Sequence, residues 1–230
     1  MMMMAGQSNP TWHYAAGKWP GKAGLLLGPS YFKKQALRPW LPYALDNDAF
    51  TAWQQKREWS EPAWREMLQW ARMTGYKPIW AIVPDVVADR QATLDNWQRY
   101  APAVDEIGWP KAFAVQDGMT PDDVPETAAI VFVGGSDSFK WRTVKMWVSN
   151  FRRVHVGRVN NIEKVWLCQD LGVESVDGTG WFKDPSREDK LPALLGWFEN
   201  RRSETPELPM AHDLRTNDQA QPQRDYDKRS

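Results

Sequence analysis

The sequence of 230 residues lacks the features that characterise disulfide-bonded, membrane-spanning and secreted proteins. Its one cysteine, Cys168, excludes an intramolecular disulfide and a thiolate-rich zinc site. No apolar run approaches the roughly 18 residues that a membrane-spanning helix needs. The first ten residues also lack the apolar core of a signal peptide. We therefore expect a soluble, cytoplasmic protein with no membrane partner.

The chain has no excess charge of either sign. Lysine and arginine number 29, and aspartate and glutamate also number 29, so the formal net charge is zero. This balance disfavours binding of nucleic acid by bulk positive charge alone, but it is compatible with a local basic groove. The hydrophobic content of 42% and charged content of 25% exclude full disorder.

The two ends of the chain differ from the body. Residues 1–10 contain a run of four methionines and predict a disordered start. Residues 203–230 contain six acidic and four basic residues, one tyrosine and no tryptophan or phenylalanine. Such a stretch buries too little apolar area to offset its ordering entropy, so we expect a flexible polar tail. The single catalytic domain would then span residues 11–202.

The body alternates between short apolar runs and segments with helical spacing. The apolar runs are rich in β-branched residues, which is typical of buried strands, and about seven strand–loop–helix units follow one another. This alternation predicts an α/β fold with a parallel sheet. The expected strands are 23–27, 43–45, 79–83, 112–115, 130–133, 154–156 and 174–176, and the expected helices are 61–74, 91–100, 141–152, 161–171 and 190–201.

Polar or glycine-containing motifs follow nearly every expected strand, as in Leu45-Asp46-Asn47 and Val176-Asp177-Gly178. In a (β/α) barrel these strand ends converge on one mouth, whereas an open sheet spreads them along an edge. A TIM-like (β/α) barrel is therefore favoured over a doubly wound sheet. Its eighth strand is either Thr11–Tyr14 or missing, which would leave the barrel incomplete.

Three carboxylates, those of Asp46, Asp85 and Asp177, come directly after expected strands. An aspartate in this position often caps the next helix or forms an Asx-turn, and each of the three fits that role by itself. Three acids at one barrel mouth would repel one another, however, and such repulsion is usually tolerated where it tunes a pKa. Asp177 is the least natural cap because no helical pattern follows it.

Other residues at the ends of expected strands have features that suit the binding of a flat ligand. Gly134 and Gly135 form either a plain tight turn or a place where a ligand approaches the backbone. Gln116 offers both a donor and an acceptor. His155 is interpreted as a buried, hydrogen-bonded imidazole, and the three scattered histidines do not indicate a metal site. Most tryptophans are expected to pack in the core, among them Trp64, Trp70, Trp97, Trp147, Trp166 and Trp197.

Six motifs carry a resemblance to a known family. They are ALDNDAF, VPDVVAD, AVQDG, VFVGGSD, HVGRVN and GVESVDGTGW, and they extend from about Ala23 to Phe182. In this order they resemble the tRNA-guanine transglycosylase superfamily, above all its short phage and bacterial members that put 7-deazaguanine bases into DNA. The resemblance implies a transglycosylase, which is a pentosyltransferase, that exchanges guanine in DNA for a 7-deazaguanine.

The resemblance also implies roles for individual residues. The GVESVD segment matches the pattern around the family's nucleophile, which makes Asp177 the nucleophile. Asp46, in the loosely matched DNDAF segment, would be the second catalytic carboxylate. The implied base-binding residues are Asp85, Gln116, Gly134, Gly135 and Gly157. The basic residues that could hold phosphates, or else be solvated surface charges, are Arg158, Lys140, Lys183 and Arg187.

The chain departs from the family's tRNA enzymes because it is much shorter and has no zinc-binding insertion. These losses favour DNA with a flipped or single-stranded guanine as one substrate and a free 7-deazaguanine, such as 7-cyano-7-deazaguanine, as the other. No metal or other cofactor is expected. A protein partner or a homodimer fits a shortened chain, and a phage-encoded protein would modify DNA in the host cytoplasm.

Three other functions remain open on the same residues. One is a nucleoside or base hydrolase, in which water resolves the intermediate. Another is a guanine transglycosylase that acts on RNA. The third is a non-catalytic module that binds a purine or a nucleic acid.

Overall fold

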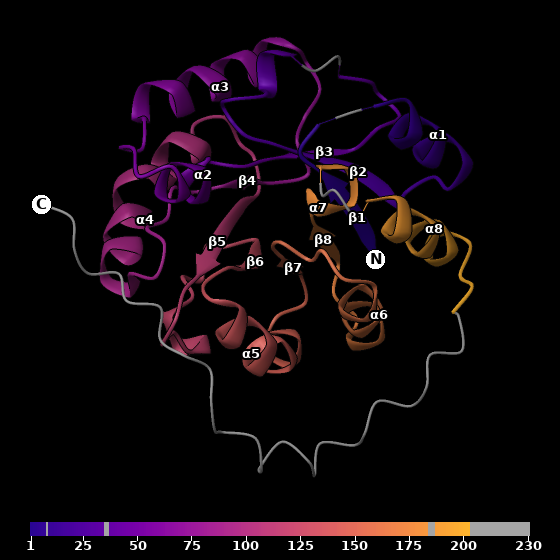
Figure 1. The fold of residues 1–230 in the computed structure, drawn as a ribbon. Helices are drawn as coiled ribbons and strands as arrows, with labels where there is room; N and C mark the ends of the chain where they lie inside the picture. Colours follow the sequence, from indigo (N-terminus) through magenta and orange to yellow (C-terminus); the bar gives the residue numbers. More distant parts are fainter. Residues whose placement is uncertain (8, 35–36, 184–186, 203–230) are drawn as a thin grey trace, which may run out of the picture.

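The computed structural model describes residues 1–7, 9–34, 37–183 and 187–202, which form a closed barrel of eight parallel strands (Figure 1). β1 pairs with β2 on one side and with β8 on the other, which closes the barrel. The TIM-type (β/α) barrel expected from the sequence is thus confirmed, and it is complete. The strands are β1 (Met2–Ala5), β2 (Ala23–Leu27), β3 (Tyr43–Leu45), β4 (Ala81–Ile82), β5 (Lys111–Val115), β6 (Ile130–Val133), β7 (Val154–Val156) and β8 (Ser175–Asp177).

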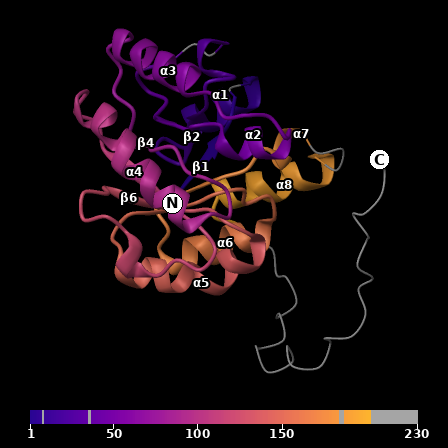
Figure 2. The same ribbon diagram turned by 90° about the vertical axis from the view of Figure 1, so that its left-hand side faces the viewer.

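Helices surround the strands on all sides (Figures 1 and 2). Ser60 and Asn161 cap α3 and α6 through their side chains, and Gly172 ends α6 with a φ of +83°. In the described part of the chain, no helix has the length and apolar character needed to cross a membrane. The helices are α1 (Pro10–Lys18), α2 (Ala49–Gln54), α3 (Glu61–Met73), α4 (Arg90–Asp105), α5 (Asp137–Asn150), α6 (Ile162–Leu171), α7 (Gly180–Lys183) and α8 (Arg187–Phe198), with short 3₁₀ turns η1 (Phe32–Lys34) and η2 (Pro121–Asp123).

The first strand lies where the sequence predicted disorder. Met3 and Met4 are fully buried, and they point to opposite faces of the sheet. The expectation of a disordered start over residues 1–10 is therefore wrong, and so is the expected strand at Thr11–Tyr14, which belongs to α1. Unbranched methionine carries a weak strand signal, yet its flexible thioether fills irregular core space well. The expected tail, residues 203–230, lies outside the described residues.

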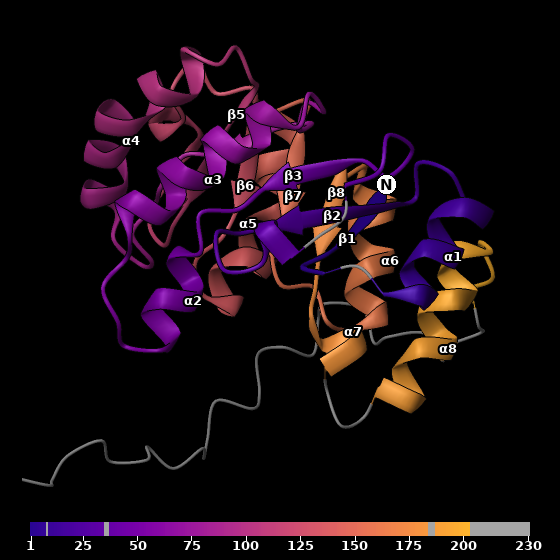
Figure 3. The same ribbon diagram turned by 90° about the horizontal axis from the view of Figure 1, so that it is seen from above.

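The first and last helices lie side by side on the barrel wall next to β1 (Figures 1 and 3). Trp19, just after α1, stacks on Phe198 at the end of α8 with ring centroids 5.2 Å apart. Trp12 meets the same phenylalanine edge-on at 5.8 Å. These contacts join the two ends of the fold, so the closure of the barrel rests on helix packing as well as on strand pairing.

The core has two layers that follow the alternation of side chains along the strands. One layer fills the barrel interior, where Trp80 packs against Phe132 and His155. The other lies between the sheet and the helices, where Trp64, Trp147 and Trp197 are fully buried. Large aromatic side chains contribute much apolar area to such a layer. The interior residues that form one buried cluster are Met4, Leu26, Ala44, Trp80, Ile82, Ala112, Ala114 and Ile130.

Most of the tryptophans expected to pack do so. Trp97 is buried, and Trp166 packs against the outer core layer. Trp70 is the exception, because 44% of it is exposed. Lys33 Nζ lies 5.3 Å from the centre of the Trp70 ring. The lysine side chain therefore covers part of the tryptophan that the barrel leaves uncovered.

Candidate active site

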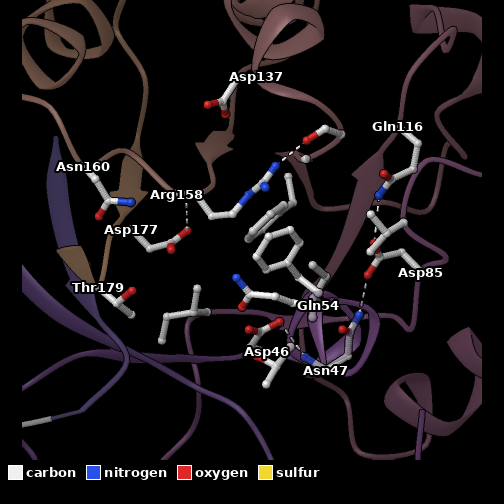
Figure 4. Close-up of a pocket in the computed structure, with 18 of the residues that line it drawn as sticks. Asp46, Asn47, Gln54, Asp85, Gln116, Asp137, Arg158, Asn160, Asp177 and Thr179 are labelled. Carbon is white, nitrogen blue, oxygen red and sulfur yellow. Dashed lines mark hydrogen bonds between the residues drawn. The ribbon is translucent and has the colours of Figure 1, made fainter. Parts of the chain in front are cut away.

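A cavity of about 610 Å³ opens at the carboxyl ends of the strands (Figure 4). The residues that follow six successive strands, β3 to β8, line it, because parallel strands deliver their ends to the same face of a barrel. The lining includes seven of the residues that the sequence singled out, namely Asp46, Asp85, Gln116, Gly134, Gly135, Arg158 and Asp177.

None of the three aspartates caps a helix. The residues that cap the neighbouring helices are others, for example Asp89, whose carboxylate accepts from the backbone N–H of Ala92 at 3.0 Å. Asp46, Asp85 and Asp177 are instead directed to the cavity, as the sticks in Figure 4 show. The structural alternative of simple capping is therefore wrong for these three residues.

Asp85 is held by two amide side chains, one on each oxygen. Asn47 Nδ2 donates to Oδ1 at 2.7 Å, and Gln116 Nε2 donates to Oδ2 at 2.7 Å. Both amides are themselves fixed, since Asn47 Oδ1 accepts from Ala49 N–H and Gln116 Oε1 accepts from Ala88 N–H. Burial raises the pKa of Asp85, while these hydrogen bonds act in the opposite direction. The result is a rigid carboxyl group with unused lone pairs facing the cavity.

Asp46 has a strongly perturbed carboxyl group. Burial raises its pKa to about 8, and the negative charges of Asp48, Asp177 and Asp85 add to the shift. One backbone N–H, that of Asn47, donates to Oδ1 at 2.7 Å and partly counteracts the shift. Asp46 therefore carries a proton at neutral pH and is able to give or take one near that pH.

Asp177 is bound through one oxygen. His155 Nε2 lies 2.9 Å from Oδ1, and the backbone N–H of Arg158 donates to the same oxygen at 3.2 Å. The side chain of Asp177 is 15% exposed, so it reaches the cavity while its partner His155 is fully buried. Arg158 has a left-handed φ of +59°, which is uncommon for a residue other than glycine.

His155 confirms the interpretation of a buried, hydrogen-bonded imidazole, because Nδ1 also lies 2.8 Å from Ser175 Oγ. Its contact with Asp177 was not predicted from the sequence, and neither were the roles of Ser175 and Asn47. Two features of the sequence could have identified Ser175 and Asn47. Ser175 precedes Asp177 by two positions and so shares its face of β8. Asn47 is a polar neighbour of Asp46 in the same strand-end motif.

The glycines divide into two kinds. Gly134 and Gly135 line the cavity, and a side chain on Gly135 would come within 2.6 Å of Asp117 Oδ2. Gly157, expected to bind the base, lies behind the lining. A Cβ there would lie 2.8 Å from the ring of Phe132, and its carbonyl accepts from Lys140 Nζ at 2.8 Å. Gly157 is therefore a packing glycine, which corrects that expectation.

The expected phosphate contacts are corrected in part. Lys140 is fully buried, donates to Gly157 O and pairs with Asp137 at 2.9 Å, so it is not available to a phosphate. Arg158 does line the cavity, but its guanidinium donates to Gly135 O and lies over the ring of Phe50 at 4.1 Å. The side chains of Lys183 and Arg187 lie outside the described residues.

The cavity thus combines four carboxyl groups, those of Asp46, Asp85, Asp177 and the Lys140-paired Asp137, with one arginine and fixed amides. Among the side chains that the structure describes, no group of three or more His, Cys, Asp or Glu is arranged to hold a metal ion. The chemistry that the described residues support by themselves is proton transfer by Asp46, nucleophilic attack by Asp177 and recognition of hydrogen-bond donors by Asp85.

The sequence matches no family profile and no curated protein. The fold is similar to that of a chain in the tryptophan synthase complex from Pyrococcus furiosus, with a TM-score of 0.50 and 13% identity over 87% of this chain and 95% of that chain. A second structure, of the α2β2 complex of the same enzyme, gives a TM-score of 0.51 and 12% identity over 86% and 94%. At such identities the likeness extends to the fold alone.

Proposed function

We propose that this protein exchanges guanine in DNA for a 7-deazaguanine base through a covalent bond between Asp177 and the sugar. The observation that carries the proposal is the convergence of Asp46, Asp85 and Asp177, from three different strand ends, on one cavity. The motif order of the sequence supports the same reaction. The cavity volume also lies within the range of about 300–1,000 Å³ that is usual for small-molecule sites.

The first half of the reaction removes guanine. The carboxylate of Asp177 attacks C1′ of the deoxyguanosine, the C1′–N9 bond breaks, and the protonated Asp46 gives its proton to the departing base. An ester between Asp177 and C1′ remains. This logic is that of retaining glycosidases, in which one carboxyl group is a nucleophile and the other an acid and then a base.

The second half reverses these steps with a different base. Asp46, now ionised, removes the proton from N9 of the incoming 7-deazaguanine, and N9 attacks C1′. The ester bond breaks and the Asp177 carboxylate is restored. The sugar keeps its original configuration because two inversions occur. The proton that Asp46 gives up in the first half is thus replaced in the second half by the proton that it takes from N9.

Recognition of the base falls to Asp85. The edge of guanine and of its 7-deaza analogues presents a ring N–H beside an exocyclic amino group, and a carboxylate accepts two such adjacent donors. Asn47 and Gln116 hold Asp85 in place for this purpose. The target nucleotide has to leave the helix stack to reach Asp177, so flipped or single-stranded guanine is the substrate form.

The test is incubation of the protein with DNA and radiolabelled 7-cyano-7-deazaguanine, followed by counting of label in purified DNA. We expect label in DNA with the wild type and with Asp122→Asn, a control that changes an exposed carboxylate. Asp177→Asn should give none. Parallel reactions with tRNA and an assay for free guanine cover the alternatives. Label in tRNA alone indicates an RNA-directed enzyme, guanine release without label indicates a hydrolase, and binding without either reaction indicates a binding module.

A further inference from the structure

The buried pair of His155 and Ser175 lies directly behind the nucleophile. In the strand ladder, His155 of β7 is the register partner of Ser175 of β8. Asp177 follows Ser175 by two positions, so both residues of β8 point to the same face as the histidine. The contacts form an unbroken chain, with Ser175 Oγ 2.8 Å from His155 Nδ1 and His155 Nε2 2.9 Å from Asp177 Oδ1.

Aromatic rings from the described part of the chain pack around the imidazole. His155 and Ser175 are 0% and 1% exposed. The ring of Phe132 stacks on His155 with centroids 4.6 Å apart, and Trp80 meets it edge-on at 5.1 Å. A polar ring in such an apolar interior needs both nitrogens satisfied, and the serine and the aspartate satisfy them.

The groups at the two ends of this hydrogen-bond chain, Ser175 and Asp177, decide which nitrogen of His155 carries the proton. An ionised carboxylate only accepts hydrogen bonds, so the nitrogen facing Asp177 has to be the donor. In the neutral ring, Nδ1 then accepts, and Ser175 Oγ donates to it. Ser175 thereby fixes the tautomer of His155, and His155 in turn fixes the carboxylate.

We propose that Ser175 and His155 are positioning residues that select Oδ2 of Asp177 as the attacking atom, an inference that rests on the proposed transglycosylase reaction. Oδ1 accepts from His155 Nε2–H and from the backbone N–H of Arg158. In the described residues no hydrogen bond to Oδ2 is found, and Asp177 lines the cavity. Of the two oxygens, Oδ2 is therefore the one that the described donors leave available for attack.

The same two donors control how the ester breaks. When Oδ2 bonds to C1′, Oδ1 becomes a neutral carbonyl oxygen, and when the ester breaks the negative charge returns to the carboxylate. Donors stabilise the ionised carboxylate more than the ester, because hydrogen bonds to a charged acceptor are the stronger ones. Loss of the donor from His155 should therefore shift the balance toward the covalent intermediate.

A pair of variants separates positioning from packing. Histidine to glutamine retains a donor near the place of Nε2, whereas histidine to asparagine is too short to reach Asp177. We expect His155→Asn to lower kcat about 100-fold with the KM for DNA changed less than about twofold, and His155→Gln to keep about tenfold more activity than His155→Asn. The fraction of protein trapped on DNA in a denaturing gel should rise about tenfold in His155→Asn. Equal losses in both variants, or a rise in KM instead, would overturn the proposal.

A measurement without turnover separates this proposal from the transglycosylase reaction itself. The protein has three histidines, so ¹⁵N-histidine labelling gives a simple long-range ¹H–¹⁵N spectrum in which loss of signals in His155→Gln assigns His155. We expect a proton on Nε2 and none on Nδ1, and Ser175→Ala should change the Nδ1 shift. A proton on Nδ1 would contradict the arrangement even if the enzyme is active. The expected tautomer in a protein that labels no DNA would refute the reaction but not the hydrogen-bond chain.

Discussion

The two sides of the cavity use the same residue type in different ways. On the β3–β5 side, which we define as Asp46, Asn47, Asp85 and Gln116, the partners of the Asp85 carboxyl are neutral amides. On the β7–β8 side, defined as His155, Arg158, Ser175 and Asp177, the carboxylate meets an imidazole and a backbone N–H through one oxygen only.

This difference matters because a carboxylate oxygen held by hydrogen bonds is less available for nucleophilic attack than one that has no such partner. Asp85 has both oxygens fixed by side chains, so it is rigid and suited to accept hydrogen bonds from a ligand edge. Asp177 has one fixed oxygen and one that faces the cavity, which suits attack on carbon. Asp46 differs from both, since its pKa of about 8 places its proton exchange near neutral pH. The comparison teaches that partners, not residue type, assign the roles of three aspartates in one cavity.

The largest expected effect separates the two sides directly. Asp177→Asn should lower kcat by about 10⁴-fold or more, because the nucleophile is lost, while the KM for DNA changes little. Asp85→Asn should lower kcat/KM about 100-fold, mainly through weaker binding of the base. Steady-state label incorporation at varied base and DNA concentrations measures both. Identical losses with identical changes in KM would mean that the two sides do not differ in role.

A smaller effect is expected from the support of Asp85. Gln116→Leu removes the donor to Oδ2 of Asp85 and leaves the Ala88 N–H without its acceptor. We expect a loss of about 10- to 100-fold in kcat/KM for the incoming base, with the reactivity of Asp177 itself retained. Gln91→Leu, an exposed change in α4, is the matched control and should have no effect. An unchanged kcat/KM in Gln116→Leu would show that Asp85 needs no such support.

The pH dependence of stability tests the raised pKa of Asp46 on the β3–β5 side. The unfolded chain releases this proton near pH 4, whereas the folded protein keeps it up to about pH 8. Between these values the folded state holds the extra proton, so stability falls as pH rises through this window. Asp46→Asn removes this dependence, and its advantage in Tm over the wild type should widen by roughly 10–20 °C from pH 4 to 8 and then level off.

The same proton governs activity. Label incorporation by the wild type should decline above about pH 8, where Asp46 no longer has a proton for the departing guanine. Thermal melts and rates over one pH series measure the two effects together. A difference in Tm between Asp46→Asn and wild type that stays constant with pH would show that the Asp46 carboxyl has an ordinary pKa in the fold.

The smallest effect is expected from Lys140, which lies behind the β7–β8 side. Lys140→Met removes the donor to Gly157 O and should lower stability by about 1–2 kcal/mol. Because the amine is buried, the salt dependence of DNA binding should not change. Fluorescence anisotropy of a labelled oligonucleotide at several salt concentrations tests this. A salt slope reduced by about one would show that Lys140 reaches a phosphate.

Much of the barrel was predictable because its strands are short, buried and marked at their ends. The bounds of β2, β3, β6 and β7 agree with the apolar runs in the sequence. β1 was missed because a methionine run shows neither alternation nor branching, although burial on both faces needs neither. α2 was missed because it is short and follows Asp48, whose side chain makes no capping hydrogen bond.

The residues that line the cavity were largely predictable from the sequence, but the hydrogen-bond contacts among them were not. Strand ends gave Asp46, Asp85 and Asp177, since topology alone brings such ends together. Strand register decides that Ser175 stands opposite His155, and a single sequence does not specify register. Likewise, the burial of Lys140 depends on how α5 packs against the barrel, so a charged residue at a helix start looked like a surface residue.

The most direct measurement is mass spectrometry of the protein after a reaction with a short guanine-containing DNA strand has been stopped by denaturation. We expect a deoxyribose-linked DNA adduct on the peptide that contains Asp177, and its absence in Asp177→Asn. An adduct on the peptide of Asp46 or Asp85 instead, or label exchange into DNA with no adduct on any peptide, would contradict the division of roles between the two sides.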